Sequence, residues 1–111
     1  MHKKRILNPD WPRSSAADFA QGIQCGDTIY VSGQVAQAAD GSMVGDGDME
    51  AQARQVFANV EAVLASGGAT LNDIVRITTY VTDMAQYAGY AKVRKELFPH
   101  ADIASATVAS P

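Results

Sequence analysis

The sequence predicts an α+β fold, in which a sheet is covered on one face by two helices. Hydrophobic residues alternate with polar ones in three segments, and in two other segments they recur every three or four residues. The elements follow in the order one or two strands, helix, strand, helix, strand, which is typical of a sheet with its helices packed on one side. With 111 residues, the chain is expected to form a single domain over residues 1–111.

Residues 19–35, FAQGIQCGDTIYVSGQV, are expected to form a hairpin. Gly26-Asp27 stands where the two arms must reverse, and glycine accepts the positive φ that such turns need. The second arm alternates, so one face would carry Ile29, Val31, Gly33 and Val35, and the other Tyr30, Ser32 and Gln34.

Two amphipathic helices are predicted. The first begins after Asp48, a good N-cap, and stops at Gly67-Gly68; its apolar face holds Met49, Ala53, Val56, Phe57, Val60, Val63 and Leu64. The second follows Asp83 and ends before Pro99, and one of its faces holds Met84, Tyr87, Ala88 and Ala91. Strands are expected at 73–83 and 103–109, and residues 38–48 form a polar loop.

The sheet face turned away from the helices is unusually aromatic and carries little charge. It would display Tyr30, Ser32, Gln34, Thr78 and Tyr80. We therefore expect other subunits to cover it, although an ordinary amphipathic sheet face in a monomer remains the alternative.

Composition excludes several classes of function. Nine basic and twelve acidic side chains give a net charge of -3, which is unsuited to binding nucleic acid. The chain contains neither an apolar run that could span a membrane nor the apolar core of a signal peptide, so no membrane association is expected. A single cysteine, Cys25, cannot form an internal disulfide, which favours a cytoplasmic location.

Few side chains suggest catalysis on their own. His2 and His100 are isolated, so neither a metal site nor a cofactor is expected. Cys25 is interpreted as a small core residue rather than a nucleophile, and Arg54 and Arg76 as solvated or interface charges. These residues alone predict only an oligomer with a small polar pocket where its subunits meet.

Four segments resemble the RidA family, also called YjgF/YER057c/UK114: VSGQV, EAQARQVFANVEAVLASGGA, DIVRITTYVTDM and the closing strand. The resemblance implies a chorismate-mutase-like α+β fold with an antiparallel-rich mixed sheet. It also implies a homotrimer with a central barrel and clefts between the subunits. In active members these clefts hydrolyse enamines and imines to a 2-oxo acid and ammonia.

The resemblance also indicates which residues line the cleft: Phe19, Ser32, Gly33, Gln34, Ala91, Ser105 and Thr107. Ser105 stands where the family has the arginine that binds the substrate carboxylate. Phe19 replaces a tyrosine, Ala91 replaces an asparagine, and Thr107 stands where active members have a small polar residue or cysteine. The family also has a further strand bearing a glutamate, which the sequence up to Pro111 lacks; we expect the sequence to be incomplete rather than the sheet to lack a strand, since that loss would expose a sheet edge.

The resemblance leaves three functions to weigh. Because Ser105 cannot replace a bidentate arginine, we expect a divergent member with a cleft for a small-molecule ligand. The alternative is an active 2-iminobutanoate/2-iminopropanoate deaminase, a hydrolase of C=N bonds. The third is endoribonuclease activity of the L-PSP type, which the acidic balance disfavours.

Overall fold

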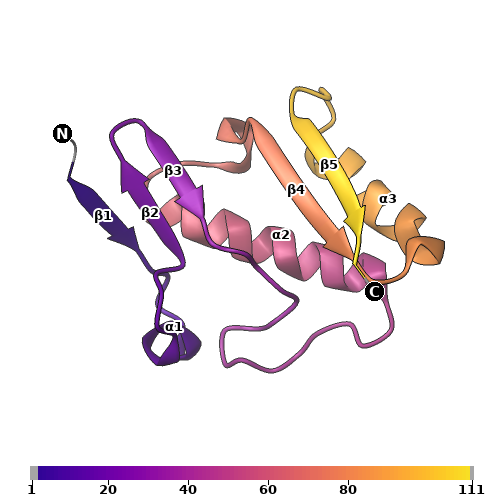
Figure 1. Ribbon diagram of the computed structural model, residues 1–111, viewed down its shortest axis with the longest axis horizontal. Helices are drawn as coiled ribbons and strands as arrows, with labels where there is room; N and C mark the ends of the chain where they lie inside the picture. The colour runs from indigo at the N-terminus through magenta and orange to yellow at the C-terminus, as the bar shows by residue number, and fades with distance from the viewer. Residues whose placement is uncertain (1–2, 111) are drawn as a thin grey trace.

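The computed structural model describes residues 3–110 and contains two sheets (Figure 1). His2 lies outside the described residues. The first sheet is antiparallel, in the order β1-β2-β3, and the second is a parallel pair, β4-β5. The strands are β1 (Lys4–Leu7), β2 (Gly22–Cys25), β3 (Thr28–Val31), β4 (Arg76–Val81) and β5 (Ala104–Ala109). The fold is thus α+β, as predicted.

The helices within residues 3–110 are α1 (Pro12–Ala16), α2 (Met49–Ser66) and α3 (Tyr87–Leu97), with 3-10 turns at Leu71–Asp73 and Met84–Gln86. Helix α2 runs behind both sheets, and α3 lies behind β4 and β5 (Figure 1). The two long helices therefore lie on one side of the strands. No helix in this part of the chain is long and apolar enough to cross a membrane.

The bounds of α2 agree with its predicted capping residues. The side chain of Asp48 accepts the Ala51 N–H at 3.1 Å, which satisfies one of the free donors of the first turn. Gly67 is the C-cap, and Gly68 follows with φ 78°, a conformation that favours glycine. Asp83 was expected to cap the second helix, but its side chain accepts the Ala85 N–H at 2.9 Å and caps the 3-10 turn Met84–Gln86 instead, so that α3 begins only at Tyr87.

The hairpin forms as predicted, with Gly26 at φ 61°, but its second arm is shorter than the sequence suggested. Regular pairing ends at Val31. Beyond it, the Ser32 N–H donates to the Gln21 carbonyl at 2.8 Å, and the chain then leaves the sheet. Helix α1, which starts with Pro12 and has only five residues, was not predicted.

The larger core cluster belongs to the half of the molecule that contains β4, β5 and α3. Phe57 of α2 lies between two aromatic rings there, with its centroid 6.3 Å from that of Tyr90 and 5.7 Å from that of Phe98. Val93 is fully buried beside them. The hydroxyls of Tyr90 and Thr79 are hydrogen-bonded at 2.7 Å, which ties α3 to β4.

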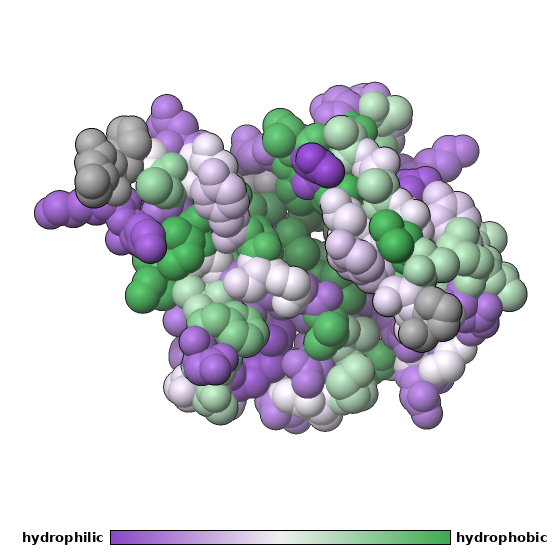
Figure 2. Space-filling model, viewed as in Figure 1, coloured by the Kyte–Doolittle hydropathy of each residue, from purple (hydrophilic) through white to green (hydrophobic). Residues whose placement is uncertain are grey.

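A groove of about 1240 Å³ separates β3 from β4, because no ladder joins the two sheets within residues 3–110. Figure 2 shows hydrophobic side chains in this hollow. Val56 and Val60 of α2, predicted as core positions, are only half-buried and lie among the lining residues.

Candidate functional site

The residues predicted to line a cleft fall into two groups on opposite sides of β4 (Figure 1). The first group, Phe19, Ser32, Gly33 and Gln34, lies around the end of β3, and the second, Ala91, Ser105 and Thr107, lies on α3 and β5. No hydrogen bond within residues 3–110 joins the groups. In one copy of the chain the predicted residues therefore lie in two separate groups.

The first group is organised by backbone and amide hydrogen bonds. The Ser32 hydroxyl donates to the Ala20 carbonyl at 2.6 Å. The Gln34 amide nitrogen donates to Gln21 Oε1 at 2.9 Å and to the Ser32 carbonyl at 3.2 Å. Because a backbone carbonyl can only accept, the nitrogen of Gln34 must face it, and Oε1 must point elsewhere.

Gln34 Oε1 is the distinctive polar atom of this group. It is buried and has no hydrogen-bond partner within residues 3–110. Leaving such an acceptor unsatisfied costs about 1–3 kcal/mol, so a donor from water or a ligand would stabilise the site. The adjacent Gly33 borders open space, since a Cβ built there would meet nothing within 4 Å. Phe19 is 57% exposed.

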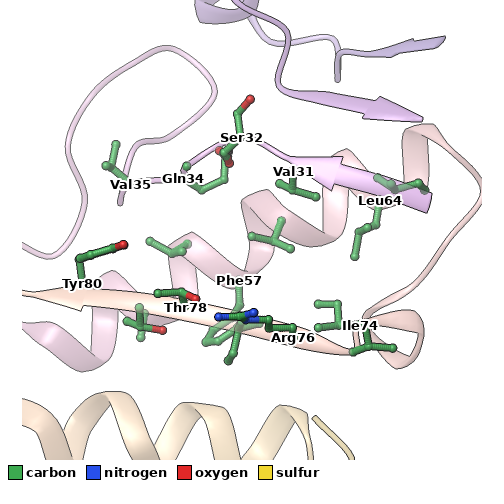
Figure 3. Close-up of a pocket in the computed structure, with 18 of the residues that line it drawn as sticks. Val31, Ser32, Gln34, Val35, Phe57, Leu64, Ile74, Arg76, Thr78 and Tyr80 are labelled. Carbon is green, nitrogen blue, oxygen red and sulfur yellow. Dashed lines mark hydrogen bonds between the residues drawn. The ribbon is translucent and has the colours of Figure 1, made fainter. Parts of the chain in front are cut away.

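The groove beside this group is mainly apolar. Figure 3 shows Ser32 and Gln34 just after β3, Phe57 and Leu64 on α2, and Thr78 on β4. Its side chains provide a hydrophobic floor between two strand edges, with Arg76 and two aspartates the charged residues of its lining. Ser32, Gly33 and Gln34 of the first group belong to its lining.

Beside the second group lies Arg94 of α3, a residue that the sequence did not single out. Its Nη1 donates to Ser105 Oγ at 3.5 Å, and its Nη2 donates to the Tyr87 hydroxyl at 3.1 Å. The bond to Tyr87 is the main cause that raises the pKa of Arg94 above its ordinary value. The sequence could have indicated Arg94, because it follows Ala91 by three residues on a predicted helix and so shares the face of that helix.

The remaining candidates have ordinary surroundings. Arg54 is exposed and forms ion pairs with Glu50 at 3.2 Å and Glu96 at 2.9 Å, as a solvated charge should. Cys25 is a free thiol at the end of β2 and is only half-buried, which makes it less of a core residue than predicted. His100 is exposed on the loop between α3 and β5.

Comparison with known sequences gives one family. The sequence model of the family described as Endoribonuclease L-PSP matches residues 12–110. A RutC family protein of Pyrococcus abyssi is 32% identical over 88% of this chain and 76% of its own length. A 2-iminobutanoate/2-iminopropanoate deaminase of Dermatophagoides farinae is 28% identical over 97% of this chain and 84% of its own length.

Solved structures agree with this family. A putative endoribonuclease of Thermotoga maritima, 28% identical, superposes with a TM-score of 0.88 over 97% of this chain and 85% of that chain. The protein YyfA of Yersinia pestis, described as a member of the conserved Rid protein family, is also 28% identical. It superposes with a TM-score of 0.89 over 97% of this chain and 86% of that chain.

Proposed function

Because the chain belongs to the RidA family, whose sequence model is described as Endoribonuclease L-PSP, we propose that its copies form small-molecule clefts that hydrolyse imines. In this reaction water adds to the C=N carbon, and the adduct collapses to a carbonyl compound and ammonia. The name of the Dermatophagoides relative supports this choice of substrate. The observation that carries it in this structure is the buried oxygen of Gln34, which has no hydrogen-bond partner within residues 3–110.

The chemistry demands little of the protein. An imine carbon is already electrophilic, so holding the substrate and one water in contact provides much of the rate. Once its side chain turns toward the groove that Gln34 lines, the buried Oε1 can accept a hydrogen bond from the imine N–H or from the attacking water. Either role orients a reactant without requiring a charged base. This arrangement supports hydrolysis of a small, polar and reactive substrate.

We also propose that the cleft lies between subunits of a homotrimer. In one copy, β4 lies between the first group of predicted cleft residues and the second (Figure 1). A site that uses both groups therefore needs a second copy of the chain. Tyr30 and Tyr80 are 64% and 70% exposed on the strand face opposite the helices, which supports a covering partner. Sedimentation at micromolar concentration tests this: a species of 11.7 kDa, the mass of one chain, would contradict it.

Imine hydrolysis is tested by generating 2-iminobutanoate with an amino-acid oxidase and trapping the surviving imine with semicarbazide. The protein is expected to remove imine faster than a buffer control. Gln34→Leu should reduce this rate by roughly 10-fold, as expected for the loss of one positioning hydrogen bond. The matched control is Gln24→Leu, a half-buried glutamine on β2 whose hydrogen bonds are long, at 3.4 Å. Equal rates with and without the wild-type protein would overturn the proposal.

RNA cleavage, the function in the family's description, has less support in this chain. His100 lies alone on an exposed loop, and the net charge of -3 opposes the approach of a polyanion. Incubation with a defined RNA without metal should leave the RNA intact.

A further inference from the structure

Gln21 is a buried glutamine that the sequence did not single out. It comes directly before β2, and only 3% of its surface is exposed. Its backbone N–H donates to Asn8 Oδ1 at 2.8 Å, and its carbonyl accepts the Ser32 N–H at 2.8 Å. The backbone of Gln21 is therefore fixed from two sides, which gives its side chain a defined direction.

The side chain of Gln21 binds the amide of Gln34. Gln21 Oε1 accepts one N–H of Gln34 Nε2 at 2.9 Å, and the Ser32 carbonyl accepts from the same nitrogen at 3.2 Å. A side-chain amide has two N–H donors, so both are used. Ser32 belongs to the same short segment as Gln34, whereas Gln21 is thirteen residues earlier in the chain. Within residues 3–110, Gln21 is thus the side chain that holds the Gln34 amide to another part of the fold.

The surroundings of the Gln34 amide favour one of its two orientations. If its oxygen and nitrogen were exchanged, Gln34 Oε1 would face the Ser32 carbonyl and Gln21 Oε1, and none of these oxygens can donate. The nitrogen therefore stays with Gln21. The oxygen, which is buried without a partner in the described residues, is the end left for another molecule. Gln34 lines the groove just after β3, so the oxygen has little distance to turn (Figure 3).

From this geometry we propose that Gln21 is a positioning residue for the reaction. By binding the nitrogen of Gln34, it makes the oxygen the end that turns to the groove, so that Gln34 acts as an acceptor rather than as a donor. Among residues 3–110, Gln21 does not belong to the lining of the groove, and it therefore acts through Gln34. This role rests on the imine hydrolysis proposed above, but the hydrogen bond between the two amides can be measured separately.

The difference between an acceptor and a donor matters for the attacking water. A water that donates to Gln34 Oε1 keeps both of its lone pairs, and one of them can form the bond to the C=N carbon. An amide nitrogen in the same place would donate to the water oxygen and occupy one of those lone pairs, which would make the water a weaker nucleophile. An imine N–H likewise needs an acceptor. Holding the Gln34 nitrogen away from the reactants therefore favours the addition of water.

The first experiment replaces Gln21 with methionine, which is of similar length and has no strong acceptor. Gln21→Met should lower the rate of imine removal by roughly 3- to 5-fold, less than Gln34→Leu, because the acceptor is kept but no longer aimed. The matched control is Gln24→Met, since the hydrogen bonds of Gln24 on β2 are long, at 3.4 Å. Thermal unfolding of each variant shows whether the fold is intact. Equal rates for the two folded variants would contradict the proposal.

A double variant tests whether Gln21 acts through Gln34. Gln21→Met combined with Gln34→Leu should remove imine at the rate of Gln34→Leu alone, because no amide is left to position. A purely structural role of Gln21 would instead slow the double variant further. Two losses that multiply would therefore overturn the proposal.

Nuclear magnetic resonance provides a readout that does not depend on activity. The side-chain amide signals of Gln34 are identified by their disappearance in Gln34→Leu. Gln21→Met should shift them upfield and make them exchange faster with water, because one N–H loses its acceptor, whereas Gln24→Met should leave them in place. Signals that do not respond to Gln21→Met would reject the positioning role even if imine is hydrolysed. Signals that respond, in a protein that removes no imine, would reject the proposed hydrolysis and leave the contact between the two amides standing.

Discussion

The β1–β2–β3 half and the β4–β5–α3 half of the molecule are stabilised differently and carry different polar groups. In the second half, the ring of Phe57 on α2 stacks on Tyr90 of α3 and meets Phe98, after α3, edge to face. In the first half, glycine allows close approach: a Cβ at Gly22 would lie 2.6 Å from Val63. The first half presents a neutral amide oxygen at Gln34, and the second presents a cation at Arg94.

This difference supports the proposed cleft between subunits. In a single chain β4 separates the amide from the cation (Figure 1). An assembly that places the first half of one copy against the second half of another would combine them, and this is the physical argument for a cleft between subunits.

The largest loss of stability is expected when the ring of Phe57, at the centre of the second half, is removed. Phe57→Ala should destabilise the protein by about 3–5 kcal/mol, because Phe57 contacts both Tyr90 and Phe98 and collapse around the cavity would be incomplete. Urea unfolding measures this loss. Phe19→Ala is the control, since its ring is 57% exposed and its removal should change the free energy of unfolding by less than about 0.5 kcal/mol.

The second test concerns how the segment after β3 is attached to α2. Asn59 is buried, and its Nδ2 donates to the carbonyls of Val35 at 3.1 Å and Gln37 at 2.9 Å. Asn59→Ala should cost about 2–3 kcal/mol, because two carbonyls lose their donor. It should also increase protease cleavage between residues 35 and 47. The exposed Asn72→Ala should do neither, and equal cleavage of both variants would show that Asn59 does not hold this segment.

The close approach in the first half provides the third test. Gly22→Ala should cost about 1–2 kcal/mol, because its Cβ would meet the rigid and fully buried Val63. Combined with Val63→Ala, the loss should be smaller than the sum of the two single losses, since the second change removes the obstructing methyl. Gly33→Ala is the control, because its Cβ would meet open space. Strict additivity at Gly22 and Val63 would contradict the contact.

The sequence allowed the long elements to be predicted, because their boundaries depend on local residues. Asp48 and Gly67 delimit α2, and Gly26 permits the turn of the hairpin. Helix α1 escaped prediction because a five-residue helix gives almost no periodicity. The groove was not predicted for a different reason. It exists because β3 and β4 do not pair, and no local sequence pattern shows which strands pair.

The candidate site could be predicted only in part, for the same reason. Ser32 and Gln34 were found because one motif carries both. Arg94 was missed because its contact with Ser105 depends on α3 lying beside β5, and Ser105 comes eleven residues later in the chain. A contact between two elements is a tertiary property, whereas the spacing that placed Arg94 next to Ala91 on one helix face was visible in the sequence.

The smallest expected effect concerns the ion pairs that join α2 to α3 on the surface. The hydrogen bonds from Arg54 lower the pKa of Glu96 below its ordinary value. A carboxylate whose pKa is lowered by folding stabilises the protein above its unfolded pKa, and this contribution is lost as the pH falls. Glu96→Gln should therefore lower the urea midpoint slightly at pH 7 and leave it unchanged at low pH.

Salt provides the independent check on that pair, because both partners are exposed. At 1 M salt, where the screening length is about 3 Å, wild type and Glu96→Gln should unfold at nearly the same urea concentration. Glu61→Gln is the control, since Glu61 is exposed and has no ion pair within residues 3–110. A difference between wild type and Glu96→Gln that persists at low pH and at high salt would mean that packing between α2 and α3, rather than charge, depends on Glu96.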